Sequence, residues 1–175
     1  MRNRTLVAVI STLFIILLYV LIPGLKNTRN QFRAEVAFKS GKWEKAAKLY
    51  KRVVSYNPRS AKVLTRLGYC YLELGKRDKA IAIFQRSLRM DSTQFKTYRW
   101  LGDAFLQKEA YSDAGQSFKG LILAYRRHHS LSKEDAGDYL YAFDKLVLCE
   151  LKLQNDPLAL RHLHEFTSVL RTKID

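Results

Sequence analysis

A pattern of apolar and small residues recurs in this chain with a period of 34 residues. In a block counted from Ala61, positions 4, 7, 8, 11, 15, 20 and 24 are Leu64, Leu67, Gly68, Tyr71, Gly75, Ala80 and Phe84. A block counted from Phe95 repeats the pattern at every one of these positions except 15, where Glu109 replaces the glycine. Its matching residues are Tyr98, Leu101, Gly102, Phe105, Ala114 and Phe118. Such a period is typical of helix pairs that cannot bury their apolar faces alone and stack on their neighbours. The sequence therefore predicts an all-α fold of stacked helical hairpins.

A weaker copy of the pattern precedes these blocks, over residues 27–60. Asn30 and Arg33 stand where the other blocks have a large apolar residue and a leucine. A first unit has no preceding neighbour to cover, so this departure is typical of a capping unit. The residues that do fit the pattern are Ala34, Gly41, Trp43, Ala46, Tyr50 and Pro58.

The blocks 27–60, 61–94 and 95–128 resemble the tetratricopeptide repeat (TPR) family. The resemblance implies a solenoid of helix pairs with a concave groove, and a role as an adaptor in protein–protein interaction. Because one fold hosts many unrelated ligands, the resemblance does not identify the partner.

The segment 131–175 is predicted to form a further helical hairpin. Ser132 can cap a helix that begins with an acidic pair, and Asp156-Pro157 is typical of the start of another helix. These two helices show no clear match to the 34-residue pattern. We interpret the pair as a divergent C-terminal hairpin that closes the stack.

The N-terminal segment has the composition of a membrane span. Residues 1–5 form a basic tail, and residues 6–25 are apolar or small and carry no charge. A helix of this length can cross a bilayer, and Pro23-Gly24 is expected to end it. A cleaved signal peptide would have a shorter apolar core followed by a small-x-small site. The sequence thus predicts an uncleaved transmembrane anchor and a single-pass membrane protein.

The basic residues on either side of this span bear on its orientation. Arg2 and Arg4 precede the span, whereas several Lys and Arg follow it, so the positive-inside bias favours a cytoplasmic repeat domain. Folded domains translocate largely regardless of charge, so a periplasmic or luminal location stays open.

Positive charge declines along the chain from the predicted span. The net charge is +15, and residues 26–60 hold ten Lys or Arg against two Glu, whereas residues 129–175 hold six against eight acidic residues. Anionic bilayers attract basic residues near their surface. Lys45, Lys48 and Arg52 share one helix face and are candidate contacts with the membrane surface, with a solvated face as the alternative. Nucleic acid is not expected, because no base-stacking aromatic residues interleave with the basic ones.

The sequence contains no recognisable catalytic, cofactor-binding or metal site. His162 and His164 would point in different directions on a helix, and the histidines at 128–129 have no further ligand at metal-binding spacing. Cys70 and Cys149 each lie in an apolar helical run and are interpreted as buried, small apolar residues. We expect no enzymatic activity, no cofactor and no metal.

The TPR resemblance also implies which side chains face the groove. Positions 2, 5, 9, 12 and 13 of each first helix do so in the family. The candidate contacts taken from the second and third repeats are Lys62, Thr65, Tyr69, Lys96, Arg99 and Asp103. Family members that bind the terminal carboxylate of a chaperone tail use five groove residues, of which this chain keeps only Lys96. The groove is therefore expected to bind a protein segment with acidic groups, and capture of a chaperone tail is not favoured.

These features predict a membrane-tethered scaffold that recruits or organises partners at the bilayer surface. The expected partners are proteins with acidic segments and the lipid bilayer itself. Two alternatives stay open at this point: a periplasmic or luminal assembly factor of a membrane or envelope complex, and a structural subunit of such a complex.

Overall fold

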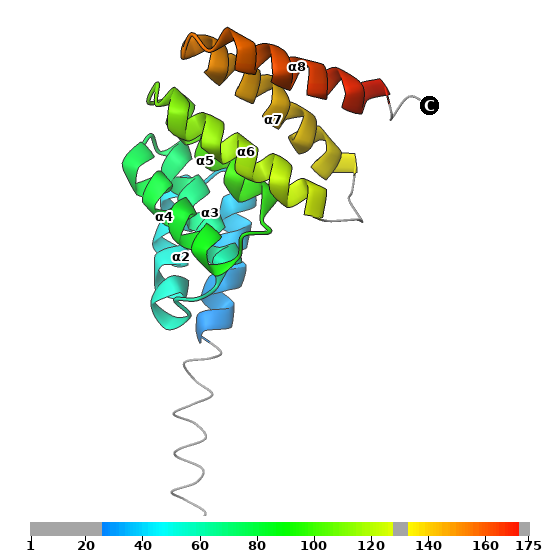
Figure 1. The fold of residues 1–175 in the computed structure, drawn as a ribbon. Coiled ribbons are helices and arrows are strands. Elements are labelled where there is room, and N and C mark those ends of the chain that lie inside the picture. Colours follow the sequence, from blue (N-terminus) through cyan, green and yellow to red (C-terminus); the bar gives the residue numbers. More distant parts are fainter. Residues whose placement is uncertain (1–25, 128–132, 172–175) are drawn as a thin grey trace, which may run out of the picture. The chain divides into compact units, whose positions relative to one another are not determined.

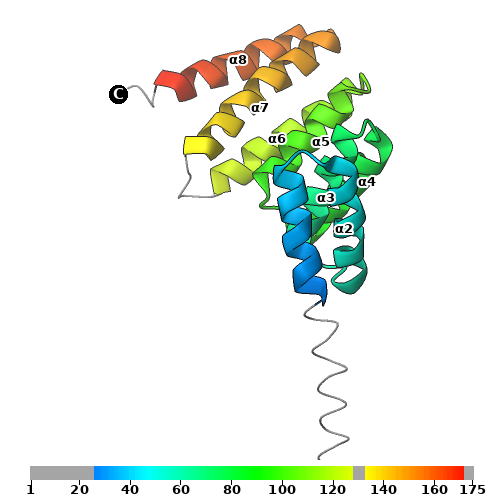
Figure 2. The ribbon, with the colours of Figure 1, turned by 180° about the vertical axis from the view of Figure 1, so that it is seen from behind.

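The computed structural model describes residues 26–127 and 133–171, with side chains over 26–127 and 137–168. These residues form eight helices and no strand (Figures 1 and 2). No helix among them is both long and apolar enough to cross a membrane. The predicted anchor at 6–25 lies outside the described residues. The chain divides into two compact units, Met1–Pro58 and Arg59–Asp175.

The first unit contains one helical hairpin. A helix over residues 26–39 precedes α2 (Trp43–Tyr56). The ring of Phe38 packs edge-on against Trp43, with ring centroids 5.4 Å apart, and the Tyr50 hydroxyl donates a hydrogen bond to Glu35. Small residues let the two helices approach closely, and the buried residues are Ala34, Ala37, Ala46, Ala47, Leu49, Tyr50 and Val53.

The second unit is a stack of three hairpins. They are formed by α3 (Ala61–Glu73) with α4 (Arg77–Met90), α5 (Phe95–Leu106) with α6 (Tyr111–Arg127), and α7 (Lys133–Lys152) with α8 (Asp156–Arg171). Each helix packs on the one that follows it, and the first helices also contact one another, α3 with α5 and α5 with α7. Figures 1 and 2 show α6, α7 and α8 side by side at one end of this stack. The all-α, TPR-like architecture is confirmed.

All four hairpins turn with the same backbone motif. At the end of α3, the Lys76 amide donates to the carbonyl of Tyr71 at 2.8 Å, and the Gly75 amide donates to Leu72 at 2.9 Å. This is the Schellman arrangement, which places one residue in the left-handed region. The residues in that conformation, with φ between 57° and 69°, are Gly41, Gly75, Glu109 and Gln154.

This motif places the C-terminal hairpin in the register of the other three, although its sequence shows no clear match to the 34-residue pattern. If Gln154 is taken as position 15, then Phe143, Leu146 and Ala159 fall at positions 4, 7 and 20, and all three are buried. The match is hidden in the sequence because Glu109 and Gln154 are 45 residues apart instead of 34. The residues that lengthen this interval include the start of α7, which is longer than the other first helices of the second unit.

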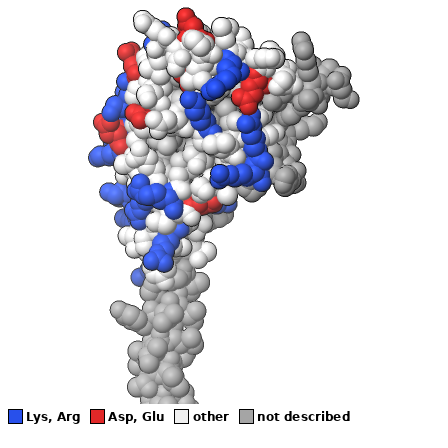
Figure 3. Space-filling model, in the orientation of Figure 1, with Lys and Arg blue, Asp and Glu red and all other residues white. Residues whose placement is uncertain are grey.

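Basic side chains are grouped on the surface of the described residues. Figure 3 shows one face, on which Lys and Arg form several groups with fewer acidic side chains between them. In the first unit, Lys45, Lys48 and Arg52 are all exposed on α2, on the side away from its buried residues. This exposure is what a membrane-surface contact requires, and it fits a solvated face equally well.

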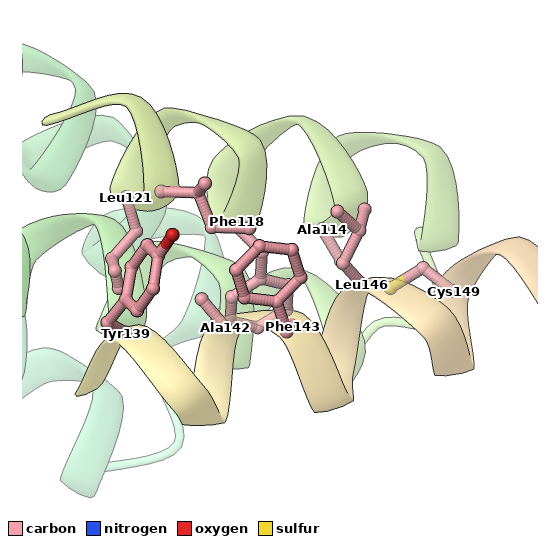
Figure 4. Packing of buried hydrophobic residues seen from close by; sticks show 9 residues of the cluster. Ala114, Phe118, Leu121, Tyr139, Ala142, Phe143, Leu146 and Cys149 are labelled. Atoms are coloured by element: carbon pink, nitrogen blue, oxygen red, sulfur yellow. The ribbon is translucent and has the colours of Figure 1, made fainter. Parts of the chain in front are cut away.

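A buried cluster of the second unit joins α6 to α7 (Figure 4). The Phe118 and Phe143 rings are fully buried in it, and Cys149 lies at one end. Burial raises the pKa of the Cys149 thiol to about 11, so it stays protonated and behaves as a small apolar side chain. Cys70 is buried as well, so the interpretation of both cysteines is confirmed. The cluster consists of Ala114, Phe118, Leu121, Ile122, Tyr139, Ala142, Phe143, Leu146 and Cys149.

Candidate protein-binding groove

The first helices of the second unit surround a hollow of about 680 Å³. It mixes aromatic side chains with charged ones of both signs, so it suits an amphipathic ligand better than a purely apolar one. The residues that line it are Tyr69, Leu72, Glu73, Gly75, Arg77, Arg99, Trp100, Asp103, Leu106, Gln107 and Tyr141.

Trp100 forms the centre of the groove. Its ring packs on Tyr69 with centroids 4.4 Å apart, and on the buried Phe84 at 6.3 Å. It also lines two adjacent hollows, one toward Asp138 and one toward Lys62. Trp100 occupies one of the five chaperone-tail positions of the family pattern, but it was not among the candidate contacts predicted from the sequence. The sequence signal that could have identified Trp100 as a groove residue is its place directly after Arg99, which occupies groove position 5.

Arg99 is already paired within the chain. Its guanidinium forms an ion pair with the buried carboxylate of Asp138, and it lies 4.3 Å from the centre of the Tyr141 ring. The Tyr141 hydroxyl in turn donates to Asp103 at 2.7 Å. Arg99 lines the groove as expected, and the start of α7 supplies a carboxylate to it from within the chain. Arg99 holds α7 against α5 and shapes the groove wall.

Burial and these contacts shift the pKa values in the wall. Burial raises the pKa of the Asp103 carboxyl, while the hydrogen bond from Tyr141 and the charge of Arg99 oppose that rise. Burial, with the hydrogen bond to Asp103, raises the pKa of Tyr141 well above its usual range. Burial and a hydrogen bond to Glu73 raise the pKa of Tyr69 to about 12. Both tyrosines thus keep their hydroxyl protons at neutral pH.

Thr65 is buried and lines the smaller hollow beside Lys62 and Lys96, where its hydroxyl is engaged within the chain. Its hydroxyl lies 2.6 Å from that of Thr97 and 2.8 Å from that of Ser87, and it donates to the Gln94 side chain at 3.0 Å. Ser87 in turn donates to the carbonyl of Ala61. This network joins α3, α4 and α5, so Thr65 holds adjacent hairpins together.

A second hollow, of about 270 Å³, lies at the basic end of the groove. Lys62, Arg66 and Lys96 surround it, and Phe95 and Trp100 supply apolar surface. The structure thus brings the predicted residues together in two groups: Lys62 with Lys96 here, and Tyr69 with Arg99 and Asp103 in the larger hollow. Trp100 is common to both. Across the residues that the structure describes, no three His, Cys, Asp or Glu side chains are grouped as metal ligands.

Comparison with known proteins supports the TPR family. Residues 33–95 match the family described as tetratricopeptide repeat. The chain is 31% identical over 130 residues to the TPR repeat-containing protein YpiA of Bacillus subtilis (strain 168), which covers 74% of this chain and 28% of that protein. It is also 38% identical over 56 residues to the BBSome complex member BBS4 of Bos taurus, covering 32% of this chain and 11% of that protein. The matched part therefore spans less than a third of either relative.

Solved structures share the fold at lower identity. The type III secretion translocator chaperone SycD of Yersinia enterocolitica has a TM-score of 0.66 at 19% identity and covers 73% of this chain and 85% of its own. The TPR2B domain–pHsp70 complex of yeast Sti1 has a TM-score of 0.60 at 17% identity, covering 69% and 98%. This chain thus carries a TPR-like helical stack.

Proposed function

We propose that this chain is a scaffold that binds a segment of a partner protein in the groove of its second unit. The observation that carries this proposal is the hollow around Trp100, whose walls come from α3, α5 and α7. Its residues lie on packed helices, so the site is formed before binding and little entropy is lost when a partner binds. Aromatic residues and Arg are also the side chains that most often dominate interface energies.

The two hollows indicate the chemistry of that segment. Tyr69 and Trp100 offer aromatic surface for an apolar or aromatic side chain. Lys62 and Lys96, beside the same tryptophan, favour an acidic group near that anchor. The yeast Sti1 neighbour was solved with pHsp70, but only Lys96 of the chaperone-tail pattern is present here. An internal acidic segment is therefore the better candidate than a terminal carboxylate.

The proposal also includes a membrane tether and excludes catalysis. Residues 6–25 would anchor the chain, and Lys45, Lys48 and Arg52 would lie near anionic headgroups. The positive-inside bias favours the cytoplasmic side. Protease treatment of sealed vesicles tests the orientation, because a cytoplasmic repeat domain would be digested in inside-out vesicles and protected in right-side-out ones.

A pull-down of the full chain from its native membrane tests the groove. The triple substitution of Lys62, Tyr69 and Trp100 by alanine should remove most of the bound partner. Arg99 is left intact, because its loss would disturb α7. The matched control replaces the exposed Lys45, Lys48 and Arg52 by alanine and should keep the partner. Full retention by the groove variant, with its circular dichroism spectrum unchanged, would place the site elsewhere.

A further inference from the structure

Two apolar surfaces of this chain lie at opposite ends of its repeat order. The first, called here the leucine face, consists of Leu148 and Leu151 on α7 and Leu160 and Leu163 on α8, all exposed. The second, the phenylalanine face, consists of Phe32 and Val36 in the helix 26–39, which are 70% and 50% exposed.

The repeat register shows what the leucine face corresponds to. In the hairpin α3–α4, positions 12, 20 and 24 are Leu72, Ala80 and Phe84, which form one cluster with Leu101 and Ala104 of the following hairpin. The same positions in the last hairpin are Leu151, Ala159 and Leu163. Leu151 is 52% exposed and Leu163 is 45% exposed, although Phe84 is fully buried. The leucine face is therefore the surface on which a following hairpin would pack.

The phenylalanine face corresponds to the other side of the same contact. Positions 6 and 10 of the hairpin α5–α6 are Trp100 and Ala104, which pack on the preceding hairpin. In the first hairpin these positions are Phe32 and Val36. The two faces therefore correspond to the two sides of the contact between the hairpins α3–α4 and α5–α6 in the second unit.

Charge supports a match between the two faces. At the junction of α3 with α5, position 5 of one hairpin contacts position 3 of the following hairpin. These residues are Thr65 and Thr97, whose hydroxyls lie 2.6 Å apart. The equivalent residues at the two open faces are Asp144 at position 5 of the last hairpin and Arg29 at position 3 of the first. Both are exposed. Residues 26–60 are strongly basic and residues 129–175 weakly acidic, so the opposite signs extend beyond this pair.

We propose that copies of this chain associate head to tail, with the phenylalanine face of one copy packed on the leucine face of the next. The junction reproduces the packing between hairpins, with Val36 against Leu151 and Leu163 of the next copy, and Arg29 opposite Asp144. Because the two surfaces differ, the contact is heterologous and adds further copies as a ring or an open filament, according to the rotation between neighbours. It would line up several grooves at the site where the scaffold works.

Cross-linking of the full chain in mild detergent tests this arrangement. Val36→Cys and Leu163→Cys variants are treated with a short bis-maleimide, separately and as a mixture. Head-to-tail contact predicts dimers in the mixture, little product from either variant alone, and a ladder of oligomers from the double variant. The native Cys70 and Cys149 are buried, and the unmodified chain measures their background. Gln85→Cys, exposed on α4, controls for random encounters within a micelle.

Two other outcomes would overturn the proposal. Efficient dimers from Leu163→Cys alone would show that two leucine faces pair with each other. Products no more abundant than those of Gln85→Cys would show that the faces serve other proteins. A charge test adds specificity: Asp144→Arg in the Leu163→Cys chain, or Arg29→Asp in the Val36→Cys chain, should each lower the mixed-dimer yield several-fold. Mixing the two charge-reversed chains should restore it, and a failure to restore it would contradict the predicted register.

Discussion

The Phe118 ring packs so closely on Gly102 that a Cβ atom at position 102 would lie 2.5 Å from its Cζ. Gly68 and Phe84 repeat this relationship at 2.6 Å in the preceding hairpin. In the last hairpin both positions differ, since Val147 and Leu163 replace the glycine and the phenylalanine. The first hairpin has Ala34 and Tyr50 at the same two positions, both buried. The glycine is therefore needed where a phenylalanine ring packs this closely on the first helix.

The first prediction concerns this crossing. Gly102→Ala should lower the free energy of unfolding by about 1–3 kcal/mol, because the added methyl group overpacks a buried ring. Gly102→Leu should cost more. Phe118→Leu should relieve part of the cost in the double variant, as the Val147 and Leu163 pair suggests. Urea unfolding of the full chain in detergent measures these differences.

Gly115 provides the matched control. It is also buried in a helix, but a Cβ there would lie 3.6 Å from the side chains of Cys149 and Leu146, which is ordinary contact. Gly115→Ala should therefore be neutral or stabilising by up to about 1 kcal/mol, through higher helix propensity. Equal destabilisation by Gly102→Ala and Gly115→Ala would contradict the overpacking account.

The second prediction uses the turn residues with positive φ. Gly75 and Glu109 have φ of 69° and 57° at equivalent positions. A side chain in the left-handed region costs about 1–2 kcal/mol, so Gly75→Ala should destabilise the chain by about 1 kcal/mol. Glu109→Gly should stabilise it by less than that, because glycine also gains entropy in the unfolded chain. Thermal unfolding decides: a lower midpoint for Glu109→Gly would mean that its side chain has a stabilising contact.

The third prediction concerns the ion pair in the groove wall. Arg99→Ala should lower the free energy of unfolding by about 1–3 kcal/mol, since it leaves the buried carboxylate of Asp138 unpaired. Lys62→Ala should change it by less than about 0.5 kcal/mol, because this side chain is exposed. Denaturant titration of both variants tests this. An unchanged free energy of unfolding for Arg99→Ala would show that the ion pair with Asp138 does not stabilise the fold, and Arg99 would then be available to a partner.

The fourth prediction is a pH dependence at His162. Burial lowers its pKa and the charge of Lys119 lowers it further, while Glu150 and Glu165 act in the opposite direction. The neutral ring is favoured in the fold, so its contribution to stability is present above the unfolded pKa of about 6.5 and is lost as pH falls through the lower folded pKa. His162→Gln should therefore reduce the loss of stability between about pH 7 and pH 5.5, measured by urea unfolding. His164→Gln, at an exposed site, should leave that loss unchanged.

Much of the fold could be predicted from the sequence because helix packing leaves a periodic trace. Residues such as Gly68, Ala80 and Phe84 are restricted by a crossing that every regular hairpin must make. The last hairpin escaped detection because α7 begins earlier than the other first helices and shifts the period. Its Schellman turn uses Gln154 instead of glycine, so the most visible marker was also absent.

The groove was less predictable, because side-chain partners across helices leave no periodic trace. Lys62, Lys96 and Tyr69 line the groove as the family pattern implies. The pairing of Arg99 with Asp138 depends on the length of α7, and the burial of Thr65 depends on polar residues from two other helices. Such contacts join residues far apart in sequence, and only the three-dimensional structure shows them.

Photo-cross-linking in the native membrane tests the groove most directly. A photoreactive amino acid replaces Lys62 at the basic end of the groove, and in a matched variant it replaces Gln85 on the exposed side of α4. The account predicts a defined protein adduct from position 62, reduced several-fold when Trp100→Ala is added, and little from position 85. An adduct from position 85 without one from position 62 would contradict it.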